Sequence, residues 1–242
     1  MRTILLKEIN DFLDSLIAYV VIGLFLIGMG LLTWVFPETN VLDYGYASME
    51  TVFIVAPYVF MFLIPAITMK SFAEEKRGGT IELLFTLPFK DIEIVAGKFL
   101  ASWVLVLFSI LPTIIYYFSI SYLGNPPGNL DTAGIIGSYL GLMLLGGVFS
   151  TIGILASALT GNQIVAFILA SFLCFTLYAG FESLASIDIW SDTSYYIKQL
   201  GILSHYESLS KGLINLADVV YFISIMVMML YFTRLVLSLQ KA

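Results

Sequence analysis

Six long runs of residues with almost no formal charge constrain the fold of this chain more than any other feature. An α-helix rises about 1.5 Å per residue, so about 20 apolar residues cover the roughly 30 Å hydrocarbon core of a bilayer. Backbone polar groups inside a bilayer must be satisfied within the protein, which favours helices. The sequence therefore predicts an all-α integral membrane protein, a six-transmembrane-helix bundle with spans at residues 16–36, 51–69, 99–123, 135–159, 163–181 and 219–239.

The composition agrees with this class. Hydrophobic residues make up 60% of the chain and charged residues only 12%, whereas a soluble domain has about 25% charged residues. Six spans and modest connections use most of the 242 residues, which predicts a single transmembrane domain over residues 1–242. The net charge of −6 disfavours a nucleic acid as partner.

The basic residues predict the orientation of the spans. Two of the eleven, Lys198 and Lys211, lie on one side of the predicted membrane. The other nine lie on the side of the two termini: Arg2, Lys7, Lys70, Lys76, Arg77, Lys90, Lys98, Arg234 and Lys241. Basic residues concentrate in cytoplasmic loops, so we expect both termini in the cytoplasm.

Residues 1–15 predict a helix that lies along the membrane surface. Leu5, Ile9, Phe12 and Leu13 recur at helical spacing, and polar residues take the other positions. Such an interfacial helix either acts as an elbow that holds the first span or is an ordinary surface anchor. The sequence alone leaves both roles open.

Residues 70–98 form a predicted cytoplasmic loop with an ordered series of helix signals. Ser71 is expected to cap a first short helix, which Gly78 and Gly79 end. Thr80 is expected to cap a second helix that Pro88 stops. Asp91 is expected to cap the helix that continues into the third span.

The second short helix of this loop is amphipathic. Ile81, Leu84 and Phe85 form a predicted apolar ridge with Glu82 beside it, and an exposed ridge of this kind needs a partner groove. The alternative is a solvated loop that only enforces topology. The order of caps, glycines and proline favours the docking element.

The same loop resembles the ABC-2-type permease family, in which paired acids and a basic residue precede Gly-Thr, Glu-Leu-Leu and a Thr-X-Pro break. The positions that carry the likeness are Glu74, Glu75, Arg77, Gly78, Gly79, Thr80, Glu82, Leu83, Leu84, Phe85, Thr86 and Pro88. Residues 204–222 are similar to the segment before the last span in the gliding-motility-associated branch, which is the closest match within the family. A proline expected just upstream of that segment is absent.

The resemblance implies that residues 70–98 contain a coupling helix, which docks on a separate nucleotide-binding ATPase subunit. It implies a second permease half, identical or homologous, and export across the bacterial inner membrane. It also implies surrounding lipid as a partner, and a role in gliding motility if the branch is right.

Several kinds of chemistry are disfavoured by the residues present. The chain has no Gly-x-x-x-x-Gly-Lys-Ser/Thr loop, so we expect it to bind no cofactor, with ATP and Mg²⁺ held by the partner ATPase. No catalytic residue and no metal site is predicted, because His205 is expected at the surface and Cys174 as a lone apolar filler. The chain is therefore expected to be a non-enzymatic subunit.

Two alternatives stay open at this point. An ATPase-coupled membrane machine that moves no substrate fits the docking loop equally well. An ion-driven carrier or channel has only the helical bundle in its favour, because no ionisable residue lies within a predicted span away from its ends.

Residues 182–218 form a long connection on the side opposite the termini. It is rich in aromatic residues, which predicts a re-entrant segment of short helices at the lipid interface. Trp190, Tyr195 and Tyr196 are candidates for an outer gate, with an aromatic anchor belt as the alternative. In the fourth span, Gly137 and Gly141 predict close helix contact, either internal or at a dimer seam.

Overall fold

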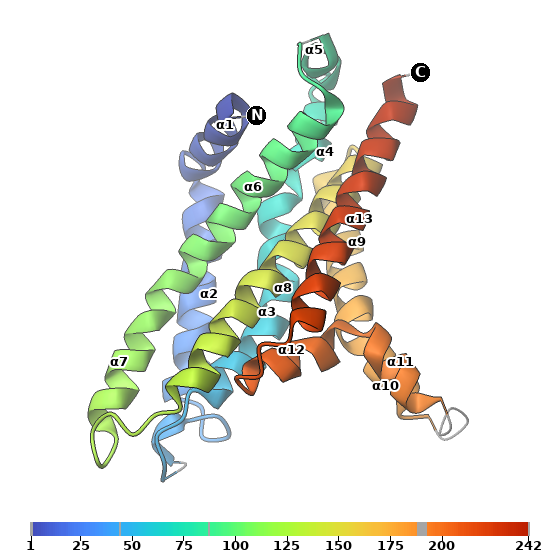
Figure 1. Cartoon of the computed structure of the whole chain (residues 1–242). Helices are drawn as coiled ribbons and strands as arrows, with labels where there is room; N and C mark the ends of the chain where they lie inside the picture. Colours follow the sequence, from blue (N-terminus) through green and yellow to red (C-terminus); the bar gives the residue numbers. More distant parts are fainter. Residues whose placement is uncertain (1, 44, 87, 188–192, 242) are drawn as a thin grey trace.

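The computed structural model describes residues 2–43, 45–86, 88–187 and 193–241, and every regular element in that part of the chain is helical. Figure 1 shows one bundle of helices, with both chain termini at the same end. We call this the terminal end of the bundle and the other the distal end.

Six helices form the body of the bundle. They are α2 (Leu16–Trp34), α3 (Glu50–Thr68), α6 (Asp91–Ile110), α8 (Thr132–Leu159), α9 (Gln163–Phe175) and α13 (Leu216–Lys241). The shorter helices are α1 (Arg2–Leu13), α4 (Lys70–Arg77), α5 (Ile81–Thr86), α7 (Ile114–Leu123), α10 (Phe181–Ala185), α11 (Ser194–Leu200) and α12 (Ile202–Ser210). Single turns complete the fold: η1 (Val41–Asp43), η2 (Leu111–Thr113) and the π-helical η3 (Thr176–Gly180).

Five continuous helical stretches of the described chain are long and apolar enough to cross a membrane. They are Glu50–Arg77, Asp91–Leu123, Thr132–Leu159, Gln163–Ala185 and Leu216–Lys241. The helices α1 and α2 together make a sixth candidate, bent by 71° at the break between them. The prediction of an all-helical membrane bundle is therefore confirmed, with five to six candidate spans, and the chain is a multi-pass membrane protein.

The helices extend beyond several of the predicted span limits. The helix α8 begins at Thr132 because the Asp131 side chain accepts a hydrogen bond from the Gly134 amide at 3.0 Å. The third candidate span begins at Asp91, so residues 91–98 of the predicted loop are helical. That span changes to a 3₁₀ turn around Pro112, where a bend is expected because proline lacks an amide N–H.

The central helix is α8, which contacts α3, α4, α6, α9, α12 and α13. Glycines permit this crowding. A Cβ on Gly153 would lie 1.9 Å from Thr68 Oγ1, and one on Gly137 would lie 2.4 Å from a backbone oxygen of α12. A Cβ on Gly141 would lie 3.2 Å from the Tyr206 ring, also in α12. The Gly137–Gly141 step therefore makes an internal contact.

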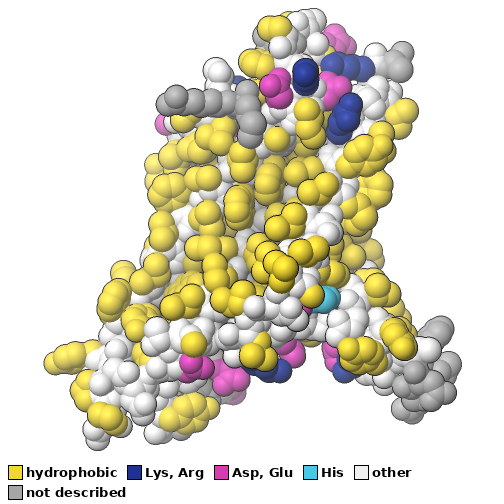
Figure 2. Space-filling model, viewed as in Figure 1, with side chains coloured by type: hydrophobic (Ala, Val, Ile, Leu, Met, Phe, Trp, Pro, Cys, Tyr) yellow, Lys and Arg dark blue, Asp and Glu magenta, His cyan; other side chains and the backbone are white. Residues whose placement is uncertain are grey.

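Buried apolar side chains form two clusters. The larger one fills the middle of the bundle and its distal half, with contributions from α2, α3, α6, α8 and α12 among others. The smaller one lies among the elements of the terminal end and joins five helices through Ile4, Phe72, Ile94, Val95, Ile154, Ala158 and Leu237. Figure 2 shows a broad hydrophobic belt between two ends that carry most of the charged side chains in view. This distribution is the one expected for a protein surrounded by lipid.

The prediction that His205 is a surface residue was wrong. Its side chain is only 11% exposed. Nδ1 lies 2.6 Å from Asp218 Oδ1, Nε2 lies 2.9 Å from the Gln199 carbonyl oxygen, and the ring stacks on Tyr221. The imidazole therefore joins α12 to the start of α13.

Candidate functional site

The helices α4 and α5 project at the terminal end of the bundle (Figure 1). The helix α4 continues α3 after Met69, which has the right-handed helical conformation. Ser71 therefore lies inside a helix, and the prediction that it is an N-terminal cap was wrong. Because α3 and α4 form one continuous stretch from Glu50 to Arg77, a displacement of α4 acts directly on a candidate span.

Two glycines end α4 as predicted. The Gly79 amide donates to the Lys76 carbonyl and the Thr80 amide donates to the Glu75 carbonyl, with Gly79 at φ +69°. This pattern is a Schellman motif, in which glycine takes a left-handed conformation that is costly for other residues. The Thr80 hydroxyl also donates to the Glu75 carbonyl, at 3.3 Å. Its side chain therefore binds the end of α4, whereas the prediction had it capping α5.

The prediction that Asp91 caps α6 was also wrong. Asp91 is the first helical residue, and Lys90 is the N-cap. The Lys90 amide donates to Glu93 Oε2 at 3.0 Å, which is the backbone half of a capping box. The acidic side chains at this helix N-terminus interact favourably with the helix dipole.

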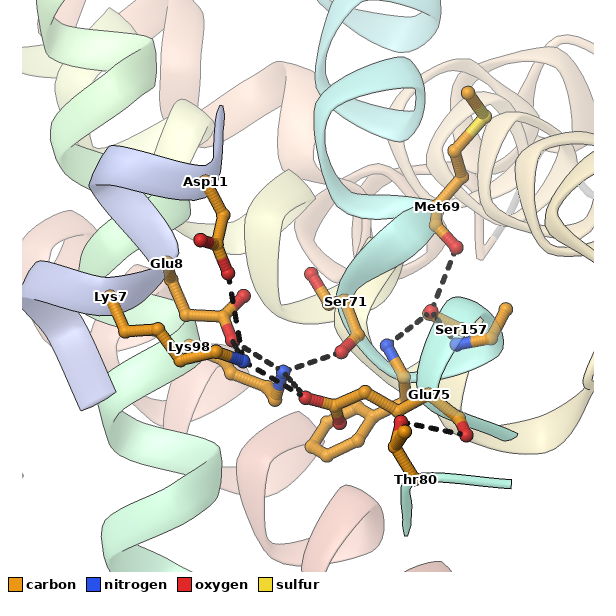
Figure 3. A network of polar contacts seen from close by, with 11 residues as sticks. Lys7, Glu8, Asp11, Met69, Ser71, Glu75, Thr80, Lys98 and Ser157 are labelled. Atoms are coloured by element: carbon orange, nitrogen blue, oxygen red, sulfur yellow. Dashed lines mark hydrogen bonds and ion pairs between the residues drawn. The ribbon is translucent and has the colours of Figure 1, made fainter. Parts of the chain in front are cut away.

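The hydroxyl of Ser157, near the end of α8, holds the junction of α3 and α4 (Figure 3). It accepts hydrogen bonds from the Phe72 and Ala73 amides at 2.9 and 3.0 Å, and it donates to the Met69 carbonyl at 2.9 Å. One side chain thus satisfies three backbone groups in a buried place, where an unpaired group costs about 1–3 kcal/mol. The position of α4 is fixed to α8.

The ammonium group of Lys98, in α6, lies at the centre of a second contact network (Figure 3). Its side chain is only 1% exposed. Nζ donates to Glu8 Oε1 at 2.7 Å, to Glu75 Oε1 at 2.9 Å and to the Ser71 carbonyl at 2.6 Å. Since an ammonium has three N–H donors, all three are used. Lys98 therefore joins α1, α4 and α6 through one buried charge.

A second lysine of α1 supports this network. Lys7 Nζ lies 3.6 Å from Glu8, Asp11 and Glu75. Burial by itself would lower the pKa of Lys7, but the three carboxylates outweigh it and raise the pKa. Two ammonium groups thus face three carboxylates at the contact between α1 and α4.

The end of α8 receives two further contacts. The Lys76 ammonium donates to the Ala158 carbonyl, and Gln240 Nε2 donates to the same oxygen at 3.2 Å. Because α8 has no intrahelical donors for its last carbonyls, these side chains cap it and bring α13 to the same place.

The apolar ridge predicted on α5 faces the protein itself. Ile81, Leu84 and Phe85 are partly buried against the terminal-end cluster, and Lys241 Nζ lies 4.9 Å above the Phe85 ring. Lys241 also pairs with Asp91 at 2.6 Å. The prediction that this ridge is exposed was therefore wrong, because α13 and the cluster cover it.

Most of the predicted docking residues are exposed, and they form a face that we call the docking face: Glu74, Arg77, Gly78, Gly79, Thr80, Glu82, Leu83, Thr86 and Pro88. The side chain of Leu83 is the large apolar one on this face, at 66% exposure. Glu75, by contrast, turns inward to Lys98 and is 15% exposed. Paired acids at adjacent positions thus have different environments.

Sequence reasoning missed Lys98, Glu8 and Ser157 as site residues. A lysine at the start of an apolar span was a usable signal, because such a charge requires a partner. Its partners come from sequence positions 90 and 23 residues away, so their identity was not readable. Ser157 gave no signal, since serine is common in membrane helices.

The candidate outer gate lies at the distal end and is only partly described. Trp190 is outside the described residues. Tyr195 and Tyr196 are 67% and 71% exposed on α11 and form an edge-to-face pair with ring centroids 5.7 Å apart. The described residues contain no group of three His, Cys, Asp or Glu side chains placed to hold a metal ion.

Comparison with family models identifies the chain. The model of the ABC-2 family transporter proteins matches residues 2–241, nearly the whole sequence. The chain belongs to the ABC-2 transporter family. A search among curated proteins finds no match. Membership in the ABC-2 family implies a membrane permease subunit that works with an ABC ATPase subunit.

Proposed function

We propose that this ABC-2 protein is the permease subunit of an exporter in the bacterial inner membrane, and that its ATPase subunit docks on the docking face of α4 and α5. The observation that carries the proposal is the exposure of Leu83 and Glu82 on a short helix that the protein's own contacts hold in place. An apolar side chain ringed by polar ones is typical of a docking knob.

The contacts behind the docking face support a transmitting role. Ser157 fixes the α3–α4 junction to α8, and Lys98 fixes α4 to α1 and α6. Packed elements transmit displacement because close-packed interiors deform little. ATP-driven movement of a docked subunit would therefore tilt several candidate spans together.

The proposal includes a second permease half, identical or homologous, because two ATPase subunits that close on each other need two docking faces. Both termini and the docking face would lie in the cytoplasm, in agreement with the nine basic residues on that side. The similarity of residues 204–222 to the gliding-motility-associated branch supports a role in that process.

Co-purification tests the docking face. We expect the wild-type protein, purified from its host, to carry an ATPase subunit, and Leu83→Asp and Glu82→Lys to weaken its binding at least about tenfold, as expected for central interface residues. Leu213→Asp and Glu38→Lys are matched controls, because these exposed residues precede α13 and α3 at their distal ends.

All four variants should elute as monodisperse protein, because the side chains changed are exposed. Retention of the ATPase by both docking variants at the level of the controls would contradict the proposal. Absence of any bound ATPase in the wild-type preparation would contradict it as well.

A further inference from the structure

A cavity of about 710 Å³ opens at the distal end between α3, α8, α12 and η3. This volume lies in the range of pockets that bind small molecules. The helix α12 closes one side of it, since Gly137 and Gly141 allow α12 to approach α8 closely. The Tyr206 hydroxyl donates to the Phe53 carbonyl at 2.7 Å, which ties α12 to α3 at the cavity wall.

The inner wall of the cavity is formed by buried aromatic residues. Phe53, Tyr178 and Tyr206 line it, with exposures of 5%, 2% and 3%. Tyr178 also packs edge-to-face on Tyr58, with ring centroids 5.7 Å apart. Aromatic faces carry negative charge density, so this wall favours apolar or cationic groups.

The hydroxyl of Tyr178 is an unused polar group in this wall. It has no hydrogen-bond partner among the described residues, and it is not one of their fully buried unpaired atoms, so its oxygen keeps some accessible surface. Tyr58 and Glu207 line the same cavity as Tyr178. An unpaired hydroxyl on a residue that lines the cavity is available to a bound molecule.

The mouth of the cavity is acidic. Glu50, Asp131 and Glu207 line it against one basic residue, Lys211. Lys211 lies 3.9 Å from Glu207 and is 71% exposed, so this pair is weak. Asp131 accepts from the Gly134 amide. Glu50 and Glu207 are the carboxylates best placed to receive a ligand cation.

The cavity also opens along the exposed side of α3. Ile54 and Tyr58, one helical turn apart on α3, line the cavity and are 55% and 46% exposed. Since α3 belongs to a candidate span, we expect lipid to reach these exposed side chains. A molecule in the cavity thus meets lipid at one side and carboxylates at the other.

We propose that this cavity binds an amphiphile with an ammonium head group. The head group would lie between Glu50 and Glu207, with its N–H groups donating to the Tyr178 hydroxyl and to the carboxylates. The alkyl chain would follow Ile54 and Tyr58 into the bilayer. This binding site is separate from the docking face, so its test does not depend on the ATPase.

Photo-cross-linking tests the site on the purified full chain in a neutral detergent. The probe is decylamine with a diazirine in its chain, and peptide mass spectrometry locates the label. We expect label on α3 near Ile54 and Tyr58. Decylammonium should compete with the probe, whereas decyl sulfate, which has the opposite charge, and methylammonium, which has no chain, should not.

Variants of the polar groups sharpen the test. We expect labelling of α3 to fall about tenfold in the double variant Glu50→Gln, Glu207→Gln, and about fivefold in Tyr178→Phe, which keeps the ring and loses one hydrogen bond. Glu38→Gln is the control, because this exposed carboxylate does not line the cavity.

Three results would overturn the proposal: label spread evenly over the spans, equal competition by decyl sulfate, or unchanged labelling in both the double variant and Tyr178→Phe. Competition by methylammonium alone would show a site for the head group without the chain, which also contradicts an amphiphile site. Tyr178→Phe guards against a folding artefact, because it removes only an oxygen atom.

Discussion

A single buried ammonium holds α1 against α4. Lys98 is 1% exposed and reaches two carboxylates from different helices. Taking one ion out of a buried pair costs about 3–5 kcal/mol, because it leaves the other charges uncompensated. We expect Lys98→Met to lower the free energy of unfolding by about that amount, and Lys98→Arg to lower it less because the charge is kept.

Thermal or denaturant unfolding of the purified protein measures this effect. Lys211→Met is the matched control, since its ammonium is 71% exposed and its pair with Glu207 is 3.9 Å long. An exposed pair contributes about 0–1 kcal/mol. Equal losses in the two methionine variants would show that the Lys98 network does not stabilise the fold.

The close packing of α3 against α8 requires the absence of a side chain at Gly153. An added Cβ would lie 1.9 Å from Thr68 Oγ1 and 2.8 Å from Thr68 Cβ, so rotation of the threonine alone does not relieve the clash. Overpacking of this kind costs about 1–3 kcal/mol. We expect Gly153→Ala to lower the unfolding temperature, whereas Gly28→Ala, with nothing within 4 Å, should not.

The unfolding temperatures of the two alanine variants give a direct comparison. Alanine has the higher helix propensity, so a neutral site gains slightly from this change. If Gly153→Ala were as stable as Gly28→Ala, the close approach of α3 to α8 would not be needed. The helices α3 and α8 would then have to move apart without a loss of stability.

At the scale of single residues, the sequence predicted local backbone roles better than long-range contact partners. The pair of glycines that ends α4 was readable, because a left-handed position after a helix selects glycine. The role of Lys98 was not, since it depends on Glu8 in α1, 90 positions away. A helix end can be predicted from adjacent residues, whereas the partner of a buried charge depends on the tertiary structure.

At the scale of elements, α4 is an extension of α3 that α8 holds in place. At the junction, the Ser157 hydroxyl accepts hydrogen bonds from two amides and donates one to a carbonyl. We expect Ser157→Ala to leave these buried groups unpaired and to cost about 1–3 kcal/mol. Hydrogen exchange should then be faster in residues 69–73.

The same experiment separates a local effect from a global one. Ser238→Ala is the control, because the hydroxyl of this exposed serine donates only to the Leu235 carbonyl, within α13. Faster exchange over the whole bundle would indicate general destabilisation. Unchanged exchange at the junction in Ser157→Ala would contradict the role of this hydroxyl.

The helix α5 shows what helical periodicity can and cannot predict about packing. Spacing identified Ile81, Leu84 and Phe85 as one face, and the structure keeps them on one face. It could not tell whether that face meets a partner or the protein's own α13, because Lys241 and Leu237 are more than 150 positions away from it in sequence. The apolar residue left for a partner is Leu83.

At the scale of the whole molecule, the hydrophobic belt and the placement of charge follow from the bilayer. The sequence predicted six spans and the structure has five to six candidates, because each span must be long and apolar on its own. The distal cavity could not be predicted, since its wall combines residues of α3, η3 and α12 that only the packed bundle brings together.

Cysteine accessibility tests the orientation of the bundle. The nine basic residues at the terminal end predict that this end is cytoplasmic. We expect a membrane-impermeant maleimide to label Asn129→Cys, in the distal loop after α7, in intact cells. Thr86→Cys, at the end of α5, should react only after the membrane is opened, because the reagent cannot reach the cytoplasm.

The wild-type protein is a suitable background, because the native Cys174 is buried and unreactive toward a polar reagent. Both chosen positions are exposed, so a difference in labelling reports the side of the membrane and not burial. The reverse pattern would place the docking face outside the cell, where no ATP-hydrolysing subunit could reach it. That result would overturn the proposed coupling together with the orientation, because the two share one topology.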